Sequence, residues 1–163
     1  MNGIALVLGA LHQGENHLAD QLTTVAGRHH AEHEVHHVAA DLGDWSRKHV
    51  RLLAEAAHHH GLDFADTSKA PEADTLSMFR AKPGDAVADA PESGLPLLRD
   101  LSELHLSATE NSLNWEMLAQ VAQATKDETL LAVVSECHPQ TLRQLRWTNT
   151  MIKTLAPQVL TTL

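Results

Sequence analysis

Apolar residues return along this chain at the spacing of an α-helix that buries one face. The clearest example has spacings of 3, 4, 3, 4, 3 and 4 residues, and its positions are Val35, Val38, Leu42, Trp45, His49, Leu52 and Ala56. This period is typical of a helix that faces the centre of a bundle. His49 falls in the middle of the apolar seam, where a polar ring needs a hydrogen-bonding partner.

The first third of the chain predicts a helical hairpin over about residues 3–60. Its first helix spans about Gly3 to Val25, with Gly27 as a stop signal, and its second spans about Ala31 to His60, with Gly61 as the C-cap. The short connection requires the two helices to run in opposite directions. One polar residue also interrupts the first helix's seam, which reads Leu8, Leu11, Glu15, Leu18, Leu22 and Val25.

A second hairpin is predicted over about residues 97–160. Its first helix spans about Leu97 to Thr125, and the stripe expected to be buried is Leu106, Glu110, Leu113 and Met117. The second helix begins after Asp127 as N-cap and reaches about Leu155, with Pro139 expected to kink or split it. Its seam is Leu130, Val133, Cys137, Gln140, Gln144, Trp147 and Met151.

A long crossover, about residues 62–96, joins the two hairpins. It holds four of the six prolines, and one short helical turn is predicted from Asp74 to Arg80. Loops of this length are uncommon unless they have a role. Here the predicted role is topological, because about 30 extended residues easily retrace a helix of about 40 Å.

The two hairpins resemble one another as an internal repeat. Shifting the first by 95 positions places Glu15 on Glu110 and His49 on Gln144, so each pair is 34 residues apart (49 − 15 and 144 − 110). The segment ENHLADQL then falls on ENSLNWEM. Each seam therefore has a polar interruption at an equivalent depth.

Two equivalent hairpins joined by one long crossover resemble the ferritin-like superfamily, over about four-fifths of the chain. The resemblance implies an all-α fold, an antiparallel four-helix bundle. Di-iron members supply one Glu from each of two helices and a Glu-x-x-His from each of the others. Glu15 (in HQGENHL) and Glu110 (in SATENSL) stand at the lone carboxylates, whereas the Glu-x-x-His positions read Ser46-Arg47-Lys48-His49 and Thr141-Leu142-Arg143-Gln144.

The implied metal ligands are therefore Glu15, His49, Glu110 and Gln144, a set that lacks both bridging carboxylates. One interpretation is a hydrogen-bonded polar layer that fixes helix register by pairing Glu15 with His49 and Glu110 with Gln144. A second is a single ion, Fe or Zn, held by Glu15, His49, Glu110 and water. A third is a working di-iron site.

Histidines crowd the predicted corner between the first two helices. His29, His33 and His37 follow at intervals of four, a spacing that lets neighbours chelate Zn or Ni at a surface. The alternative is a solvated helix start. Glu34 and His37 also match Glu-x-x-His, but they lie beside the seam.

Composition narrows the functional classes. The 163 residues suit a single domain, 1–163, and the formal net charge of −9 argues against a nucleic-acid partner. The apolar start is too short to span a bilayer and lacks a basic leader region, so no membrane partner is expected. The single cysteine, Cys137, excludes an internal disulfide and suggests a reducing, cytoplasmic compartment, where it is expected to be an inert buried thiol.

We therefore expect a cytoplasmic ferritin-like protein with a vestigial di-metal site, acting as a binding or assembly module and retaining at most one metal ion. Pairing as a homodimer is expected, with the exposed remainder of the first two helices as a candidate face. One competing hypothesis is an enzyme, an iron-handling oxidase with an unorthodox ligand set. Another is a metal buffer that uses the surface histidines.

Overall fold

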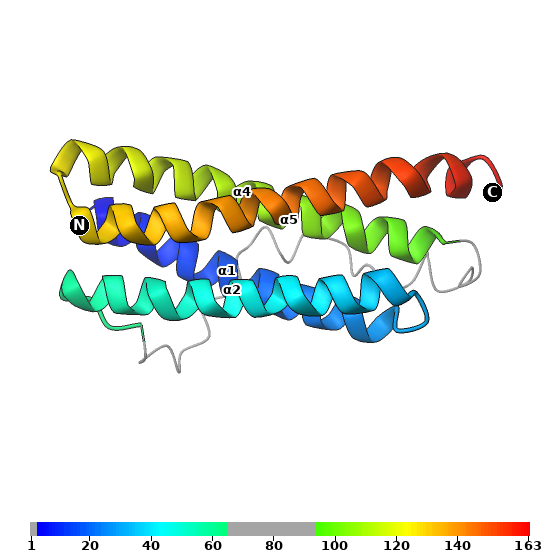
Figure 1. Cartoon of the computed structure of the whole chain (residues 1–163), viewed down its shortest axis with the longest axis horizontal. Helices are drawn as coiled ribbons and strands as arrows, with labels where there is room; N and C mark the ends of the chain where they lie inside the picture. Colours follow the sequence, from blue (N-terminus) through cyan, green and yellow to red (C-terminus); the bar gives the residue numbers. More distant parts are fainter. Residues whose placement is uncertain (1–2, 65–93) are drawn as a thin grey trace.

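The computed structural model describes residues 3–64 and 94–163. Within them all regular structure is helical: α1 (Gly3–Arg28), α2 (His33–His59), α4 (Leu95–Thr125) and α5 (Glu128–Leu160). The helices lie side by side along the long axis of the molecule (Figure 1). The predicted all-α fold with four long helices is confirmed, whereas the predicted turn at residues 74–80 lies outside the described residues.

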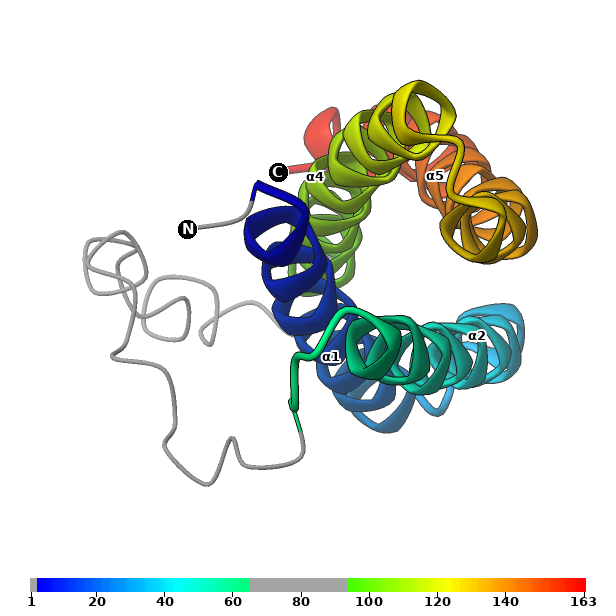
Figure 2. The same ribbon diagram turned by 90° about the vertical axis from the view of Figure 1, so that its left-hand side faces the viewer.

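Each helix packs against two others. α1 contacts α2 and α4, and α5 contacts α4 and α2, with α2 and α5 the most loosely packed of these pairs. Figure 2 shows the four helices end on, with α2 and α5 the more widely separated neighbours. The end of α1 meets the start of α4, where Arg28 and His29 bind Asp100. The end of α2 meets the start of α5, where His60 Nε2 lies 2.9 Å from Asp127 Oδ2.

Two helix ends follow the local chemistry that the sequence predicts. Asp127 caps α5, since its side chain accepts a hydrogen bond of 3.1 Å from the Leu130 backbone N–H. Gly61 follows α2 with φ of 73°, and its backbone N–H donates to the His58 carbonyl, so it ends the helix as expected.

Gly27 and Pro139 do not end or divide their helices as predicted, whereas a kink at Pro139, the other expected outcome, stays a prediction. Gly27 does not stop α1, which continues to Arg28, because Gly27 keeps a helical φ. Pro139 does not split α5, and the helix runs on to Leu160. Pro139 is exposed and cannot donate a backbone hydrogen bond, a loss that the continuous packing of α5 against its neighbours tolerates.

The buried apolar residues form two clusters, one toward each end of the bundle. One includes Leu18, Leu22, Leu101 and Leu104, and the other includes Leu8, Leu11, Leu53, Trp115 and Leu130. Between them every helix contributes buried polar side chains. The bundle thus has a polar layer between two apolar halves.

The observed seams show which helix faces were predicted correctly. The predicted seam of α1 is buried throughout. In α2 and α5 the predicted and buried stripes overlap, but each helix is turned slightly, so the next residue is often the buried one. The predicted residues that are only partly buried are Val38, Trp45, Leu52, Val133, Gln140, Trp147 and Met151. The residues buried in addition to the prediction include Ala39, Ser46, Leu53, Val134, Thr141 and Thr148.

The predicted stripe of α4 is wrong. Leu106 and Leu113 are each 61% exposed and Met117 is 50% exposed. The buried stripe has the same period but a different phase, and it consists of Leu101, Leu104, Ala108, Asn111, Trp115, Leu118 and Ala122. α4 carries two apolar stripes, and the one that contains Trp115 packs inward, where its indole reaches Glu15.

Candidate functional site: a buried polar layer

Polar side chains from all four helices are buried at mid-bundle, none more than 1% exposed: Glu15, Ser46, His49, Asn111, Thr141 and Gln144. We call these six residues the polar layer. The sequence-based expectation that Glu15, His49 and Gln144 are buried is confirmed. Because polar groups are costly to bury without partners, their contacts decide what the layer can do.

Glu15 and His49 form the centre of the layer. Glu15 Oε1 accepts a hydrogen bond of 3.0 Å from the Trp115 indole N–H and lies 3.2 Å from His49 Nδ1. The distance to His49 is that of an ion pair, but its alignment is not that of a hydrogen bond, since Nδ1 has no hydrogen-bond partner in the described part of the chain. The carboxylate therefore links α1 to both α2 and α4.

The His49 ring is also held from α5 and α4. Its Nε2 lies 2.8 Å from Gln140 Oε1, and its edge packs on Trp115 with 5.9 Å between ring centroids and an interplanar angle of 84°. A hydrogen bond to the amide oxygen requires a proton on Nε2. If the Gln140 amide is turned over, its NH₂ donates to Nε2 instead. In both arrangements His49 joins α2 to α5.

Gln144 forms a second connection between α5 and α2. Its amide Nε2 donates to the Leu42 carbonyl oxygen at 3.1 Å and to Ser46 Oγ at 2.9 Å. The predicted pairing of Gln144 with Glu110 is wrong, because Glu110 is exposed. α4 is rotated so that the next residue, Asn111, faces the interior.

Asn111 reaches the layer because its neighbour on α1 is a glycine. A Cβ placed on Gly14 would lie 2.1 Å from Asn111 Oδ1, a distance that no real contact shows. The close approach of α1 and α4 at this level therefore depends on Gly14. Sequence reasoning missed Asn111, although the unbroken 3–4 period from Leu101 to Ala122 is the signal that would have found it.

Not every polar atom of the layer is satisfied. Within the described residues, buried atoms without a hydrogen-bond partner include Glu15 Oε2, His49 Nδ1, Asn111 Nδ2 and Gln144 Oε1. Of the four predicted ligands, the structure places Glu15 beside His49, directs the Gln144 amide to Leu42 and Ser46 within the same layer, and leaves Glu110 exposed. In residues 3–64 and 94–163 no three His, Cys, Asp or Glu side chains are grouped as metal ligands.

Cys137 lies close to the layer on α5. Burial raises the pKa of its thiol to about 12, with smaller contributions in the same direction from the carboxylates of Glu15 and Glu136, while Lys48 acts in the opposite direction. The thiol is fully buried and free. It matches the expected unreactive core cysteine, because the nucleophilic thiolate is disfavoured.

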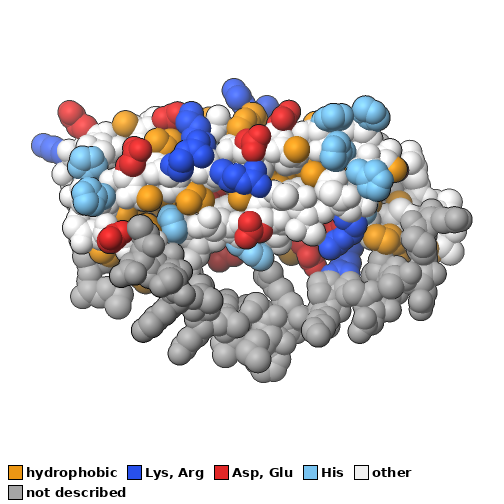
Figure 3. Space-filling view, turned by 90° about the horizontal axis from the view of Figure 1, so that it is seen from below, with side chains coloured by type: hydrophobic (Ala, Val, Ile, Leu, Met, Phe, Trp, Pro, Cys, Tyr) orange, Lys and Arg blue, Asp and Glu red, His pale blue; other side chains and the backbone are white. Residues whose placement is uncertain are grey.

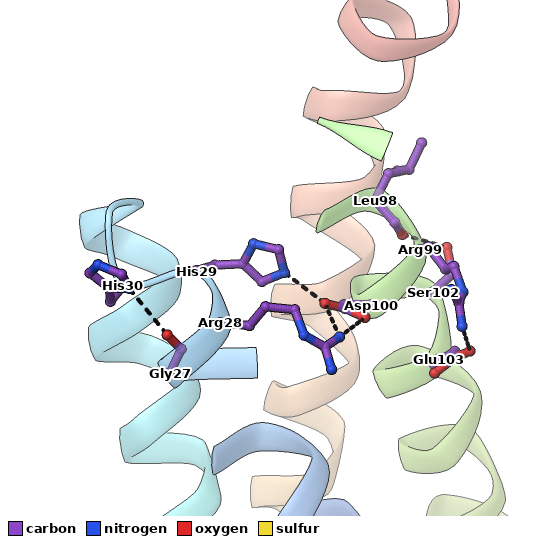
Figure 4. A network of polar contacts seen from close by, with 9 residues as sticks. All are labelled: Gly27, Arg28, His29, His30, Leu98, Arg99, Asp100, Ser102 and Glu103. Carbon is purple, nitrogen blue, oxygen red and sulfur yellow. Dashed lines mark hydrogen bonds and ion pairs between the residues drawn. The ribbon is translucent and has the colours of Figure 1, made fainter. Parts of the chain in front are cut away.

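The predicted histidine site at the α1–α2 corner is only partly assembled. The His29 ring faces Asp100 of α4, with His29 Nε2 2.6 Å from one carboxylate oxygen, and Arg28 Nη1 binds both oxygens of the same carboxylate at 2.8 Å (Figure 4). His33 and His37 are exposed, and their ring centroids are 5.0 Å apart. The structure therefore pairs His33 with His37 and engages His29 with Asp100; whether the pair binds metal stays a prediction.

Histidines also gather near the other end of α2, so pale blue side chains appear toward both ends of the face in Figure 3.

Comparison with protein-family models, curated proteins and solved structures finds no match to this chain. None of the described helices is long and apolar enough to cross a membrane.

Proposed function

We propose that this chain is an intracellular, antiparallel four-helix bundle of the ferritin-like kind whose metal-binding centre has been replaced by a polar layer, and that it acts as a binding or assembly module. The observation that carries the proposal is that several hydrogen bonds of the layer run between helices. Trp115 of α4 donates to Glu15 of α1, and Gln144 of α5 donates to Ser46 of α2. His49 of α2 is hydrogen-bonded to Gln140 of α5.

Such a layer specifies how the helices align along their axes. Sliding one helix by a turn, about 5.4 Å, would separate the donor and acceptor pairs that this helix makes with its neighbours. Each polar group left buried without a partner costs about 1–3 kcal/mol, so displaced packings are disfavoured. A buried polar position of this kind sets register and oligomer state in helical assemblies. A precisely aligned bundle is a suitable frame for presenting a binding surface.

The ferritin-like assignment is supported by how the helix ends meet. Arg28 at the end of α1 binds Asp100 near the start of α4, and His60 after α2 binds Asp127 before α5. These contacts fit two hairpins packed against one another in opposite directions. The chain leaves the described part after Phe64 and re-enters at Gly94, which fits one long crossover between the hairpins.

The donor set does not fit a di-iron centre. Two irons need several carboxylates for charge and geometry, and the polar layer offers only Glu15, because Glu110 is exposed. The remaining donors near it are one imidazole, amides and hydroxyls, which hold hard divalent ions weakly. An iron oxidase built on Glu15, His49 and Glu110 is therefore the less supported alternative.

The test compares metal content and ferrous-ion oxidation in protein purified without an affinity tag. We expect substoichiometric metal and an oxidation rate equal to that of buffer. The matched variants are Glu15→Gln in the layer and Glu110→Gln on the surface. Stoichiometric iron together with oxidation that is lost in Glu15→Gln but retained in Glu110→Gln would overturn the proposal.

A further inference from the structure

The outer side of α4 carries an apolar stripe that the bundle does not use. We call Leu106, Glu110, Leu113 and Met117 the α4 stripe. Its three apolar side chains are between 50% and 61% exposed, and it continues onto α1 through a shallow groove where Val7 lies beside Met117 and Val121. Clustered exposure of large apolar groups marks an interaction surface.

We propose that the α4 stripe is the interface through which two copies of this chain pair about a twofold axis near Glu110. This inference rests on the assembly role proposed above and names the surface that performs it. The proposed dimer face therefore lies on α4 and α1, not on α1 and α2 as the sequence led us to expect. Among the described residues, α2 has no large apolar side chain as exposed as Leu106, Leu113 and Met117.

The size of this face suits a dimer. α1 has 26 residues and α4 has 31, so together they present a surface about 40 Å long and about 20 Å wide. The whole outer side of the two helices thus spans roughly 800 Å² per copy, comparable to one side of a standard stable interface, and the α4 stripe supplies three of its large exposed apolar side chains. A twofold interface uses the same patch on both copies, so the patch must complement itself.

The arrangement of residues along α4 is self-complementary. In an antiparallel pair centred between Thr109 and Glu110, Leu106 of one copy lies opposite Leu113 of the other (106 + 113 = 109 + 110). The same register places Arg99 opposite Gln120 of the second copy, one helical turn from its Glu116. Arg99 already binds Glu103 at 3.2 Å within its own chain, so it would lie between two carboxylates.

The exposed carboxylate of Glu110, at the centre of the α4 stripe, opposes pairing. A twofold axis near Glu110 brings two carboxylates of like charge together, which weakens the dimer. Glu110→Gln should therefore tighten self-association severalfold. A partner that binds through a basic residue would respond in the opposite direction and bind this variant less well.

The experiment measures the mass of the full chain in solution by sedimentation over a wide concentration range. We expect a dimer for the wild type and for Leu142→Glu, which changes a 45% exposed leucine on α5, and a monomer for Leu113→Glu. Circular dichroism should show that all three are equally helical. When Leu106→Cys and Leu113→Cys proteins are mixed and oxidised by dissolved oxygen, a mixed disulfide should form, because residue 106 of one copy lies opposite residue 113 of the other. The buried Cys137 should not compete.

A wild type that is monomeric at every concentration would overturn the proposal, as would a dimer that survives Leu113→Glu or loosens in Glu110→Gln. Failure of the proposed function gives a different result. It would appear as stoichiometric iron and Glu15-dependent oxidation, whatever the oligomeric state. A metal-free monomer without oxidase activity would reject only the α4 interface.

Discussion

At the residue scale, the polar layer depends on one close approach between backbones. Gly14 of α1 faces Asn111 of α4, and Asn111 Oδ1 occupies the space that a side chain on residue 14 would need. Asn111 is 1% exposed and surrounded by packed residues, so it has little room to move. The absence of a side chain at Gly14 is thus as important to the layer as the polar groups themselves.

Gly14→Ala is expected to destabilise the bundle by about 1–3 kcal/mol, because the new methyl group displaces Asn111 or separates the two helices. The measurement is the free energy of unfolding in urea. Gly9→Ala on the same helix is the matched control, since nothing lies within 4 Å of its added Cβ. Gly9→Ala should stabilise by about 0.5–1 kcal/mol through helix propensity, and an equal gain for Gly14→Ala would contradict the packing described.

At the scale of the element, α4 shows how one helix serves two surfaces. Its buried stripe holds Trp115 and Asn111, whereas its outer stripe holds Leu106, Leu113 and Met117. Both have helical period, and they lie on nearly opposite sides of the helix. The stripe that faces the core is the one that contains Trp115, whose ring packs beside His49 and whose indole N–H donates to Glu15.

Trp115→Phe is expected to cost about 1–3 kcal/mol of unfolding free energy, because it leaves a buried carboxylate oxygen of Glu15 without its donor. Trp147→Phe makes the same chemical change on α5 at an indole N–H that lacks a hydrogen-bond partner in the described residues. Its effect should therefore be clearly smaller. Chemical denaturation of both variants measures the difference, and equal losses would show that ring size, not the hydrogen bond, matters at residue 115.

At the scale of the whole molecule, the layer divides the core into two apolar halves and holds the four helices in one alignment. Apolar contacts alone are tolerant of sliding, since leucine packs against leucine in many registers. Directional hydrogen bonds are not. The layer should therefore contribute more to a unique structure than to stability.

Replacing the layer in the triple variant Glu15→Met, His49→Leu and Gln144→Met tests this division. We expect helical content and the urea midpoint to be kept or raised, because unpaired polar atoms are removed, while amide NMR spectra show several packings. The volume-conserving double variant Leu11→Met and Leu53→Met, within the apolar half beside the layer, should keep one set of resonances. A single native-like spectrum for the triple variant would contradict a register role.

Much of this organisation could be predicted from the sequence. The period of apolar residues predicted four long helices and the seam of α1, and the polar breaks at Glu15, His49 and Gln144 predicted a buried layer. Asp127 predicted the start of α5, because capping depends on residues close together in the chain. These features are local or follow from a single helix face, so the order of residues is enough to predict them.

The tertiary structure alone decided which stripe of α4 faces inward. Two stripes with the same period are indistinguishable in the sequence, and the choice depends on the surfaces that α1 and α5 present. That choice moved Glu110 to the exterior, brought Asn111 against Gly14 and turned the predicted ligand set into a polar layer. Helical period is thus determined along the chain, whereas the identity of the buried face is determined by the neighbours against which it packs.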